Sequence, residues 1–378
     1  MKKILTIFFI LFSIQASAEE IYFGGFSFIG NDDQSSRYPY AAELSSKESL
    51  LLNEKLTESL KLFNRADLTI KTDKTKLSDG SKKMITFSLS DEKIERLKEK
   101  DGIYSFYKVL AQILIFDFDS KKIIFNYPVA IQYQDFTQDI PSSDDDEKIF
   151  RQIYLDLNFE SNIFKHWTNQ LMEIKIKEPG ALNIKVGKVE LSSEVKEQLP
   201  DYLKINNIFE IQTAQRFEFQ LATNQSASML PYTIGKIGNK KMLNARFVDG
   251  ISYDLEIPES DYDLNILVRE FKKIKIDEDN FDGYVFGAFV TMELIEPLTN
   301  KKYLESKFNI KNKLMFPKNE KYEILNEWDI YQRTQDLLFS NLTKQISNRN
   351  KDELKKITNT KNIEEQFKKF EEILSKCK

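Results

Sequence analysis

Two short segments of the chain share one pattern, and this repeat constrains the fold more than any other feature. The segments run from Gln112 to Phe125 and from Thr291 to Leu304. In both, an apolar stretch reaches an acidic residue, a short turn containing Ser or Thr follows, and two lysines precede a second apolar stretch. This order predicts a β-hairpin in each place. An acid-led helical pattern follows each hairpin after a loop, so we expect two related halves.

The first half is expected to begin with an apolar strand and to end with a helix. Leu52, Leu56 and Leu60 recur at helical spacing, which predicts a helix with one buried face. In order, the expected elements are a strand over 21–29, a helix over 46–64, strands over 84–89, 104–118 and 122–133, and a closing helix over 145–175.

The second half repeats this order. Its expected elements are a strand over 182–191, a helix over 209–222, strands over 242–248, 252–257, 265–276, 284–295 and 302–310, and a closing helix over 326–346. We therefore predict an α+β fold of two tandem domains whose shared order points to a duplication. Each domain is expected to be a mixed or antiparallel sheet packed with helices.

The best domain boundary is Glu178-Pro179-Gly180, which follows a helical pattern and precedes a strand pattern. The expected organisation is a signal peptide over 1–18, an N-terminal domain over 19–178, a C-terminal domain of similar order over 181–347, and a charged amphipathic helical tail over 348–378. In the tail, Phe367, Phe370 and Leu374 mark one apolar face. That face suits either docking on the second half or self-association.

The N-terminus has the features of a secretory signal peptide. Two lysines precede an apolar run over 4–14, and Ala16-Ser17-Ala18 fits the small-residue cleavage site. The mature chain would then begin at about Glu19, and because this residue is not cysteine, no N-terminal lipid anchor is expected. We therefore expect an exported, periplasmic protein.

Charge and hydropathy exclude two kinds of partner. The chain has 55 Lys and Arg against 59 Asp and Glu, and its pI is about 5.5. Proteins that bind nucleic acid usually carry a basic patch and a high pI, so no nucleic-acid partner is expected. After the signal peptide, no stretch is long and apolar enough for a spanning helix, so the chain is not expected to cross a membrane.

Few residues are available for catalysis or for soft metals, because His166 is the only histidine and Cys377 the only cysteine. A Ser-His-Asp or Cys-His system would have to use His166, which we expect instead to pack beside Trp167 at the edge of a buried helix face. Zinc sites draw on several His or Cys ligands, so none is expected. Cys377 is expected to be an unpaired thiol near a fraying end, with an intermolecular disulfide as the alternative.

Two acidic stretches have structural interpretations. The stretch over 277–283 fails the EF-hand pattern at Phe281 and Ala288, so we interpret it as a turn between strands, with a weak calcium site as the alternative. The acids over 144–147 fit the first turn of a helix capped at Ser143 or Asp144, where they face the positive end of the helix dipole.

Two further motifs lack their companion residues. The glycines over 24–30 match a Gly-x4-Gly spacing, but Asn31-Asp32 follows in place of Lys-Ser/Thr. A bulge or a close backbone approach is the better interpretation. Ser-x-x-Lys occurs over 90–93 and 105–108, without the Ser-Asp-Asn and Lys-Thr-Gly elements of penicillin-recognising enzymes.

The sequence therefore assigns no catalytic, cofactor-binding or metal-binding residue. The leading hypothesis is an exported, non-enzymatic envelope protein that binds a protein or another envelope component, as an assembly accessory factor. One alternative is a carboxylate-based glycan hydrolase, because the 59 acids leave many candidate pairs. Another is a small-molecule binding protein with a site between the two halves. Self-association through the C-terminal helix is a further hypothesis.

Overall fold

A computed structural model describes residues 18–30, 36–73, 82–177, 180–318 and 323–377. The predicted signal peptide up to residue 17 and the boundary residues Glu178 and Pro179 lie outside these ranges. Within them the chain forms helices and two mixed sheets, so the predicted α+β class is confirmed.

Both halves of the chain follow the predicted order of elements. The first half contains β1 (Glu19–Ile29), α1 (Pro39–Lys47), α2 (Ser49–Leu60), β2 (Leu68–Lys71), β3 (Lys83–Glu99), β4 (Gly102–Asp117), β5 (Ile123–Thr137), α3 (Ser143–Leu155) and α4 (Ile163–Glu173). The second half contains β6 (Ile184–Leu191), α5 (Ser193–Gln198), α6 (Asp201–Lys204), the 3₁₀ helix η3 (Ile205–Asn207), α7 (Ile208–Gln225), β7 (Lys236–Ile237), β8 (Lys240–Phe247), β9 (Ser252–Glu256), β10 (Tyr262–Asp277), β11 (Phe281–Glu296), β12 (Lys301–Pro317), α8 (Glu327–Asn348), α9 (Lys351–Ile357) and α10 (Ile363–Lys376).

Two predicted helices are each divided in the structure. The helix predicted over 46–64 is α1 and α2, because the backbone leaves the helical region at Glu48 and Pro39 starts α1 earlier than expected. The closing helix predicted over 145–175 is α3 and α4. Ser142 caps α3, one residue before the predicted caps, and Asn162 starts α4 with a second side-chain cap.

Each of the two sheets contains four strands with the same arrangement. Sheet A has the order β5-β4-β3-β1-β8-β7, with β2 paired to β1 and β9 paired to β8. Sheet B has the order β12-β11-β10-β6. β1 runs parallel to β3, and β6 runs parallel to β10. The strands β3, β4 and β5 form an antiparallel meander, as β10, β11 and β12 do. The two predicted hairpins are β4–β5 and β11–β12.

The irregularities of the two sheets also correspond. The register shifts at Gly24 and Gly187 in the first strand, at Ser90 and Arg269 in the second, and at Ile124 and Tyr303 in the last. The tight turns have positive φ at Lys121 and Asn300, at the same place in each hairpin. Because bulges fix the register, positions in sheet A can be compared one by one with positions in sheet B.

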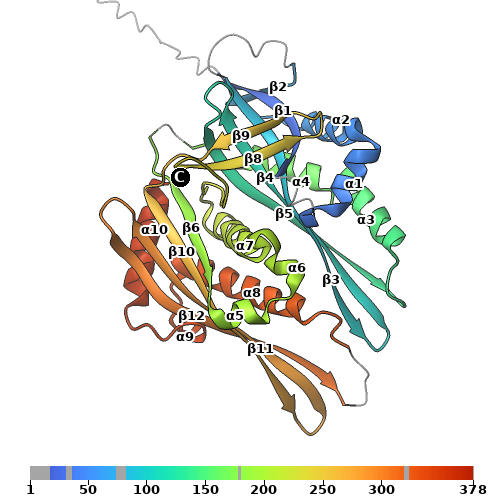
Figure 1. Ribbon diagram of the computed structural model, residues 1–378, viewed down its shortest axis with the longest axis vertical. Helices are drawn as coiled ribbons and strands as arrows, with labels where there is room; N and C mark the ends of the chain where they lie inside the picture. The colour runs from blue at the N-terminus through green and yellow to red at the C-terminus, as the bar shows by residue number, and fades with distance from the viewer. Residues whose placement is uncertain (1–17, 31–35, 74–81, 178–179, 319–322, 378) are drawn as a thin grey trace, which may run out of the picture.

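The molecule is built in alternating layers of helix and sheet (Figure 1). Helices α1 to α4 cover one face of sheet A, and α7, α8 and α10 cover one face of sheet B. α7 also packs against β5, so this helix lies between the two sheets. Among the described residues, no helix covers the other face of sheet B.

One segment of the second half completes the sheet of the first. β8 pairs antiparallel with the end of β1, where Phe28 lies opposite Arg246, and β9 pairs with β8. Both strands lie inside the range 181–347 that the sequence assigns to the C-terminal domain, yet they belong to sheet A. The two halves are therefore joined by backbone pairing as well as by side chains.

The C-terminal tail belongs to the core of the second half. Phe367, Phe370 and Leu374 on α10 are at most 1% exposed, and the Phe367 ring stacks on Phe308 of β12. The apolar face predicted from the sequence is real, but it is covered by sheet B and α8. Self-association through this face is therefore corrected to docking within the chain, since the same apolar surface cannot serve both.

Candidate functional site

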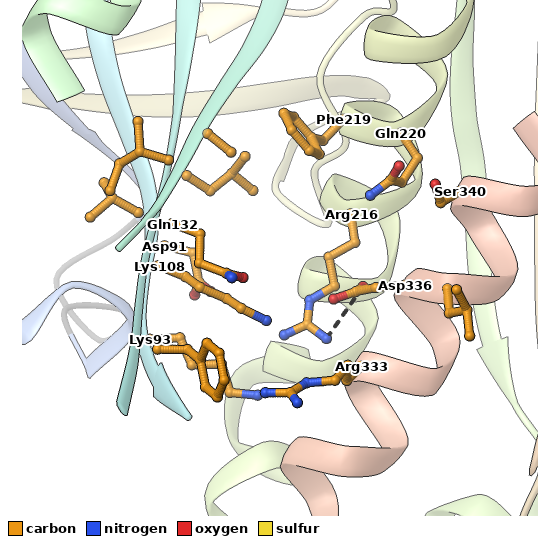
Figure 2. Close-up of a pocket in the computed structure, with 16 residues that line it drawn as sticks. Asp91, Lys93, Lys108, Gln132, Arg216, Phe219, Gln220, Arg333, Asp336 and Ser340 are labelled. Carbon is orange, nitrogen blue, oxygen red and sulfur yellow. Dashed lines mark ion pairs between the residues drawn. The ribbon is translucent and has the colours of Figure 1, made fainter. Parts of the chain in front are cut away.

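A pocket of about 550 Å³ lies between sheet A and the helices α7 and α8 (Figure 2). Strands β3, β4 and β5 form one wall and the two helices form the other, so both halves of the chain contribute side chains. Its volume is in the range of sites for small molecules. The pocket lies where the small-molecule hypothesis requires a site.

A bulge in β3 turns three charged side chains of the sheet wall toward the pocket. Leu89 points to the helices on the opposite face of sheet A, and the unpaired Ser90 shifts the alternation by one residue. Asp91, Lys93 and Glu95 then share the pocket face. Without the bulge, simple alternation would point them into the core beneath α1 to α4.

The helix wall carries polar side chains at helical spacing. Gln212 and Arg216 are four residues apart on α7, and Gln332 and Asp336 are four apart on α8, so each pair lies on one face of its helix. Opposite faces of the same helices bury apolar side chains against sheet B. Both helices are thus amphipathic between two sheets, with the charged side toward sheet A.

Glu95 is the centre of the charged cluster. It is 1% exposed, and its carboxylate lies 3.1 Å from Lys93 Nζ, 2.8 Å from Lys108 Nζ and 3.2 Å from Arg333 Nη2. Burial alone would raise the pKa of Glu95, but the charges of Lys93 and Lys108 outweigh burial and hold the pKa well below its usual value. Glu95 is therefore an ionised counter-ion that holds three cations in place.

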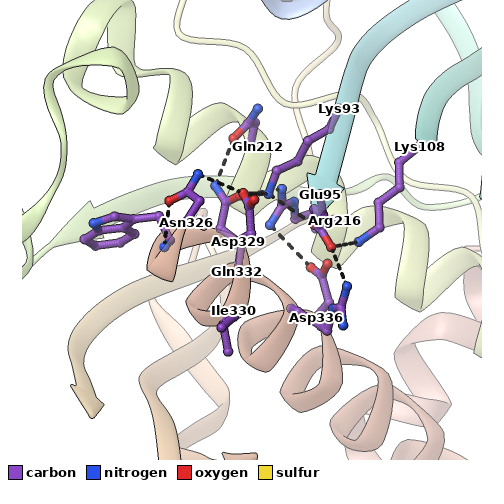
Figure 3. Close-up of polar contacts among 12 residues, drawn as sticks. Lys93, Glu95, Lys108, Gln212, Arg216, Asn326, Asp329, Ile330, Gln332 and Asp336 are labelled. Atoms are coloured by element: carbon purple, nitrogen blue, oxygen red, sulfur yellow. Dashed lines mark hydrogen bonds and ion pairs between the residues drawn. The ribbon is translucent and has the colours of Figure 1, made fainter. Parts of the chain in front are cut away.

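Lys93 joins sheet A to α8 (Figure 3). Its Nζ lies 3.1 Å from Asp329 Oδ1 and donates a hydrogen bond to Gln332 Oε1. Gln332 also accepts from Arg216 Nη2 at 3.1 Å and donates to Gln212 Oε1 at 3.2 Å. Burial raises the pKa of Asp329, and Lys93 opposes this. One continuous network thus connects β3, α7 and α8.

Asp91 is held on the other side of the same network. Gln212 Nε2 donates to its Oδ1 at 3.0 Å, and Arg37 Nε lies 3.9 Å from the same oxygen. Burial raises the pKa of Asp91, and the charge of Arg37 opposes this. Burial also lowers the pKa of Lys108, against the opposing charge of Glu95.

Arg216 and Asp336 face each other without a hydrogen bond. Arg216 Nη1 lies 3.7 Å from Asp336 Oδ1, and both atoms are buried with no hydrogen-bond partner among the described residues. Burial would lower the pKa of Arg216, but the charges of Asp336 and Glu95 reverse this, so the guanidinium stays charged. An unmet buried polar atom costs about 1–3 kcal/mol. The pair therefore holds a donor and an acceptor without hydrogen bonds in the pocket wall.

The remaining lining is mostly apolar, with the polar side chains of Gln132, Gln220 and Ser340 among it. Leu110, Ala130 and Ile131 line it on the sheet side, and Phe219 and Leu337 on the helix side. In Figure 2, Phe219 lies above Arg216, and the charged side chains gather below it. The charged lining residues are Lys93, Lys108, Arg216 and Arg333 against Asp91 and Asp336. Behind the lining, Glu95 and Asp329 pair with Lys93, Lys108 and Arg333, so the cluster as a whole is balanced. The lining by itself presents more cations than acids, and an anionic group with an apolar body would match it.

The residues singled out by the sequence do not build this site. His166 is exposed on α4, which covers the far face of sheet A, and its Nε2 lies 3.1 Å from the Glu160 carbonyl oxygen. Its predicted packing at the edge of the buried face is wrong, because only Trp167 of the pair turns inward.

Cys377 is a free thiol, but it is fully buried, so the predicted fraying end is wrong. Burial raises the pKa of this thiol to about 11, with Lys177 opposing. A disulfide between copies would require the C-terminus to leave the core.

In both Ser-x-x-Lys motifs, strand geometry separates the serine from the lysine. Lys93 and Lys108 line the pocket, but Ser90 is the bulge residue, and Ser105 lies on the opposite face of β4 because residues three apart in a strand alternate. The structure therefore brings the two lysines together and leaves both serines out. No Ser-Lys dyad forms from either motif.

The acidic stretches have the structural roles expected of them. The stretch over 277–283 contains the turn between β10, which ends at Asp277, and β11, which begins at Phe281. The described residues include no group of three or more His, Cys, Asp or Glu arranged to hold a metal ion. In α3, Asp145 closes a capping box with Ser142. Asp146 instead turns inward, where it accepts from Arg96 Nη2 at 2.5 Å and from Tyr107 Oη at 2.8 Å.

The glycines at 24 and 25 mark a bulge and a close approach, as predicted. The register between β1 and β3 shifts at Gly24, and Gly25 has φ +105°. Asn53 Oδ1 accepts from the Phe26 amide at 2.7 Å, and a Cβ at Gly25 would lie 2.7 Å from that same oxygen. Only glycine fits there.

Sequence reasoning missed the pocket residues, although one signal was present. Asp91, Lys93 and Glu95 alternate with other residues, as charges on one face of a strand would, but the strand predicted over 84–89 ends before them. From the sequence alone, such a charged face would be predicted to face solvent. Nothing in the sequence indicates that α7 and α8, more than a hundred residues later, cover it.

No protein-family model and no curated protein matches this sequence. Among solved structures, the chain is similar to a crystal structure of a minor lipoprotein from Acinetobacter baumannii, with 10% identity over 47% of this chain and 97% of that chain, and a TM-score of 0.18. At so low a TM-score, the similarity carries no argument about fold or function. In the described residues, no helix has the length and apolarity needed to cross a membrane.

Proposed function

We propose that this chain is an exported, non-enzymatic binding protein that holds a small anionic, partly apolar molecule between its two halves. The observation that carries the proposal is the Arg216–Asp336 pair, whose facing atoms are buried and lack hydrogen bonds, in the wall of a pocket that also has an apolar lining. The predicted signal peptide supports an envelope location.

The chemistry of the pocket supports this ligand class. Lys108 and Arg216 reach the pocket from opposite walls, and each is only partly neutralised by the acid next to it. A carboxylate or phosphate between them would accept charge-assisted hydrogen bonds. An alkyl or aromatic body would contact Phe219 and Leu337 and exclude water from those bonds.

Isothermal titration calorimetry with alkyl probes tests the proposal. We expect decanoate and decyl phosphate to bind, and decanol and decyltrimethylammonium to bind at least tenfold more weakly, a difference of about 1.4 kcal/mol. Equal binding of all four probes would show a merely apolar surface and would overturn the anionic assignment.

A substitution at the lip of the pocket locates the binding. Leu337 is 40% exposed, so Leu337→Trp should fold normally while its larger ring fills the pocket and abolishes decanoate binding. Leu298→Trp, at a fully solvated turn, is the matched control and should bind as the unchanged protein does. Retained binding in Leu337→Trp would place the ligand elsewhere.

The hydrolase alternative makes a different prediction for the same pocket. Asp91 and Asp336 are the acids that line it, so hydrolysis of envelope glycans would have to depend on one of them. Turnover of a glycan substrate that is lost in Asp336→Asn would favour the hydrolase over the binding protein.

A further inference from the structure

Each sheet has one face covered by helices of its own half, and the opposite faces of the two sheets differ. On sheet A, α7 packs on the face opposite α1 to α4, whereas no helix among the described residues covers the face of sheet B opposite α7, α8 and α10 (Figure 1). We call the latter the open face; it comprises the side chains of β6, β10, β11 and β12 that point away from α7, α8 and α10. Antiparallel sheets often leave one face in water, so composition must decide whether this one is a binding surface.

One part of the open face has the composition of a solvated surface. Asp263 and Glu293 occupy the positions that correspond to Met84 and Leu114, which are buried in sheet A. Glu293 lies 2.9 Å from the exposed Lys302. Charged side chains at these positions are stable in water, so no further layer has to pack on them.

The other part keeps apolar side chains among lysines. We call it the basic-apolar patch, and its residues are Lys272, Ile274, Val285, Phe289 and Lys311. Ile274 is 58% exposed and stands where sheet A has the buried Glu95. Phe289 stands where sheet A has Leu110, which lines the pocket under α7. Apolar side chains at positions that sheet A covers with helices indicate a surface that is itself covered.

The outer side of α2 has the complementary chemistry. α2 precedes the meander of its half as α7 does, and Leu50, Glu54 and Glu58 lie on its outer side at the helical spacing that puts Gln212, Arg216 and Gln220 on the sheet A side of α7. Leu50 is 65% exposed, and both glutamates are exposed. Leu50 beside Glu54 matches isoleucine and phenylalanine beside Lys311. Within one molecule Glu58 pairs with Lys55 at 2.9 Å and Lys272 with Glu270 at 2.6 Å, and across the contact Glu58 and Lys272 would exchange these partners for each other.

We propose that the basic-apolar patch binds the outer side of α2 from a second copy of this chain. This contact would repeat between two molecules the one that α7 makes with sheet A inside one molecule. It joins different surfaces of the two copies, so it is heterologous and leaves a free patch and a free α2 at the ends of each assembly. Association would therefore grow with concentration beyond a dimer.

Sedimentation velocity of the chain without its signal peptide tests this proposal. We expect the mean sedimentation coefficient to rise steadily over roughly a hundredfold range of concentration. The double variants Lys272→Glu/Lys311→Glu and Glu54→Lys/Glu58→Lys should each stay monomeric, because each sets like charges against each other. An equimolar mixture of the two variants should associate again, since the reversed charges then match.

Lys188→Glu is the matched control, an exposed lysine on the open face but outside the patch, and it should associate as the unchanged chain does. A chain that stays monomeric throughout, or a mixture that fails to associate, would overturn the proposal. Loss of association in Lys188→Glu as well would show a general charge effect and would also overturn it. Binding of the patch to phosphatidylglycerol vesicles without self-association would assign the surface to anionic lipid instead.

Discussion

Glu95 in β3 of sheet A and Ile274 in β10 of sheet B stand at the same distance from the bulge of their strand, but one side chain is buried and the other is exposed. Glu95 is buried beneath a helical layer and holds three cations, whereas Ile274 is 58% exposed. Strand pairing, bulges and turns are the same in both regions. The difference shows that the backbone frame of a half does not decide which face is covered; the layer that packs on it does.

The largest effect is expected from removing α9 and α10, which form part of the layer that covers sheet B. Deletion of residues 348–378 exposes the apolar core at Phe308 and Leu304, so we expect the second half to lose cooperative unfolding in urea. Phe367→Ala, a milder variant, should cost about 3–5 kcal/mol. Far-UV circular dichroism across a urea titration measures both. An unchanged midpoint in the deletion variant would show that the tail is dispensable.

The next largest effect separates the two equivalent positions. Glu95→Gln leaves Lys93 and Lys108 without their shared counter-ion in a buried place, so we expect a loss of about 3–5 kcal/mol of unfolding free energy. Ile274→Gln is the matched control on the exposed frame and should change stability by less than about 0.5 kcal/mol. Equal losses at both positions, measured by urea unfolding at neutral pH, would refute the contrast.

A smaller effect depends on pH and concerns the covered face of sheet A. Tyr154 Oη donates to Glu92 Oε1 at 2.5 Å, and two backbone amides also donate to this carboxyl, yet burial raises its pKa to about 8. The folded protein favours the protonated form, so this contribution to stability is full below about pH 4.5 and is lost as pH rises through 8.

Glu92→Gln keeps a neutral side chain at every pH. Its unfolding free energy should therefore fall less than that of the unchanged protein between pH 4.5 and 8. The corresponding residue of sheet B is Phe271, which does not titrate, so Phe271→Leu serves as a control that keeps the original pH profile. Identical pH profiles for Glu92→Gln and the unchanged chain would contradict the assignment.

The smallest effect is expected on the charged part of the open face. Lys302→Ala removes contacts of 2.9 Å with Glu293 and Glu305, but Lys302 is 45% exposed, so water screens the pairs. We expect a change below about 0.5 kcal/mol, measured by thermal unfolding at low and high salt. A larger loss would mean that this part of the face is covered after all.

Most secondary structure was predictable because strand and helix periods are local. The repeated hairpin and the acid-led closing helix follow from apolar spacing and turn residues, whereas the parallel pairing of the first strand was not predicted. The candidate site was only half predictable. Asp91, Lys93 and Glu95 alternate in the sequence, but the predicted strand ends at residue 89, whereas β3 continues to Glu99. The bulge at Ser90 that aims these side chains is fixed by pairing with β4, which no local pattern encodes.

The sequence alone determined the α+β class, the two similar orders of elements, the glycine at the β1 bulge and the amphipathic character of α10. Only the tertiary structure decided what each apolar or charged face meets. Placing α7 between two sheets buries the charges of β3 in a network, β8 crosses to sheet A, and α10 docks on sheet B. Local periodicity indicates that a face can be buried, but long-range packing decides which element covers it. The same arrangement of strands can therefore carry a covering layer, as in sheet A, or none, as on the open face of sheet B.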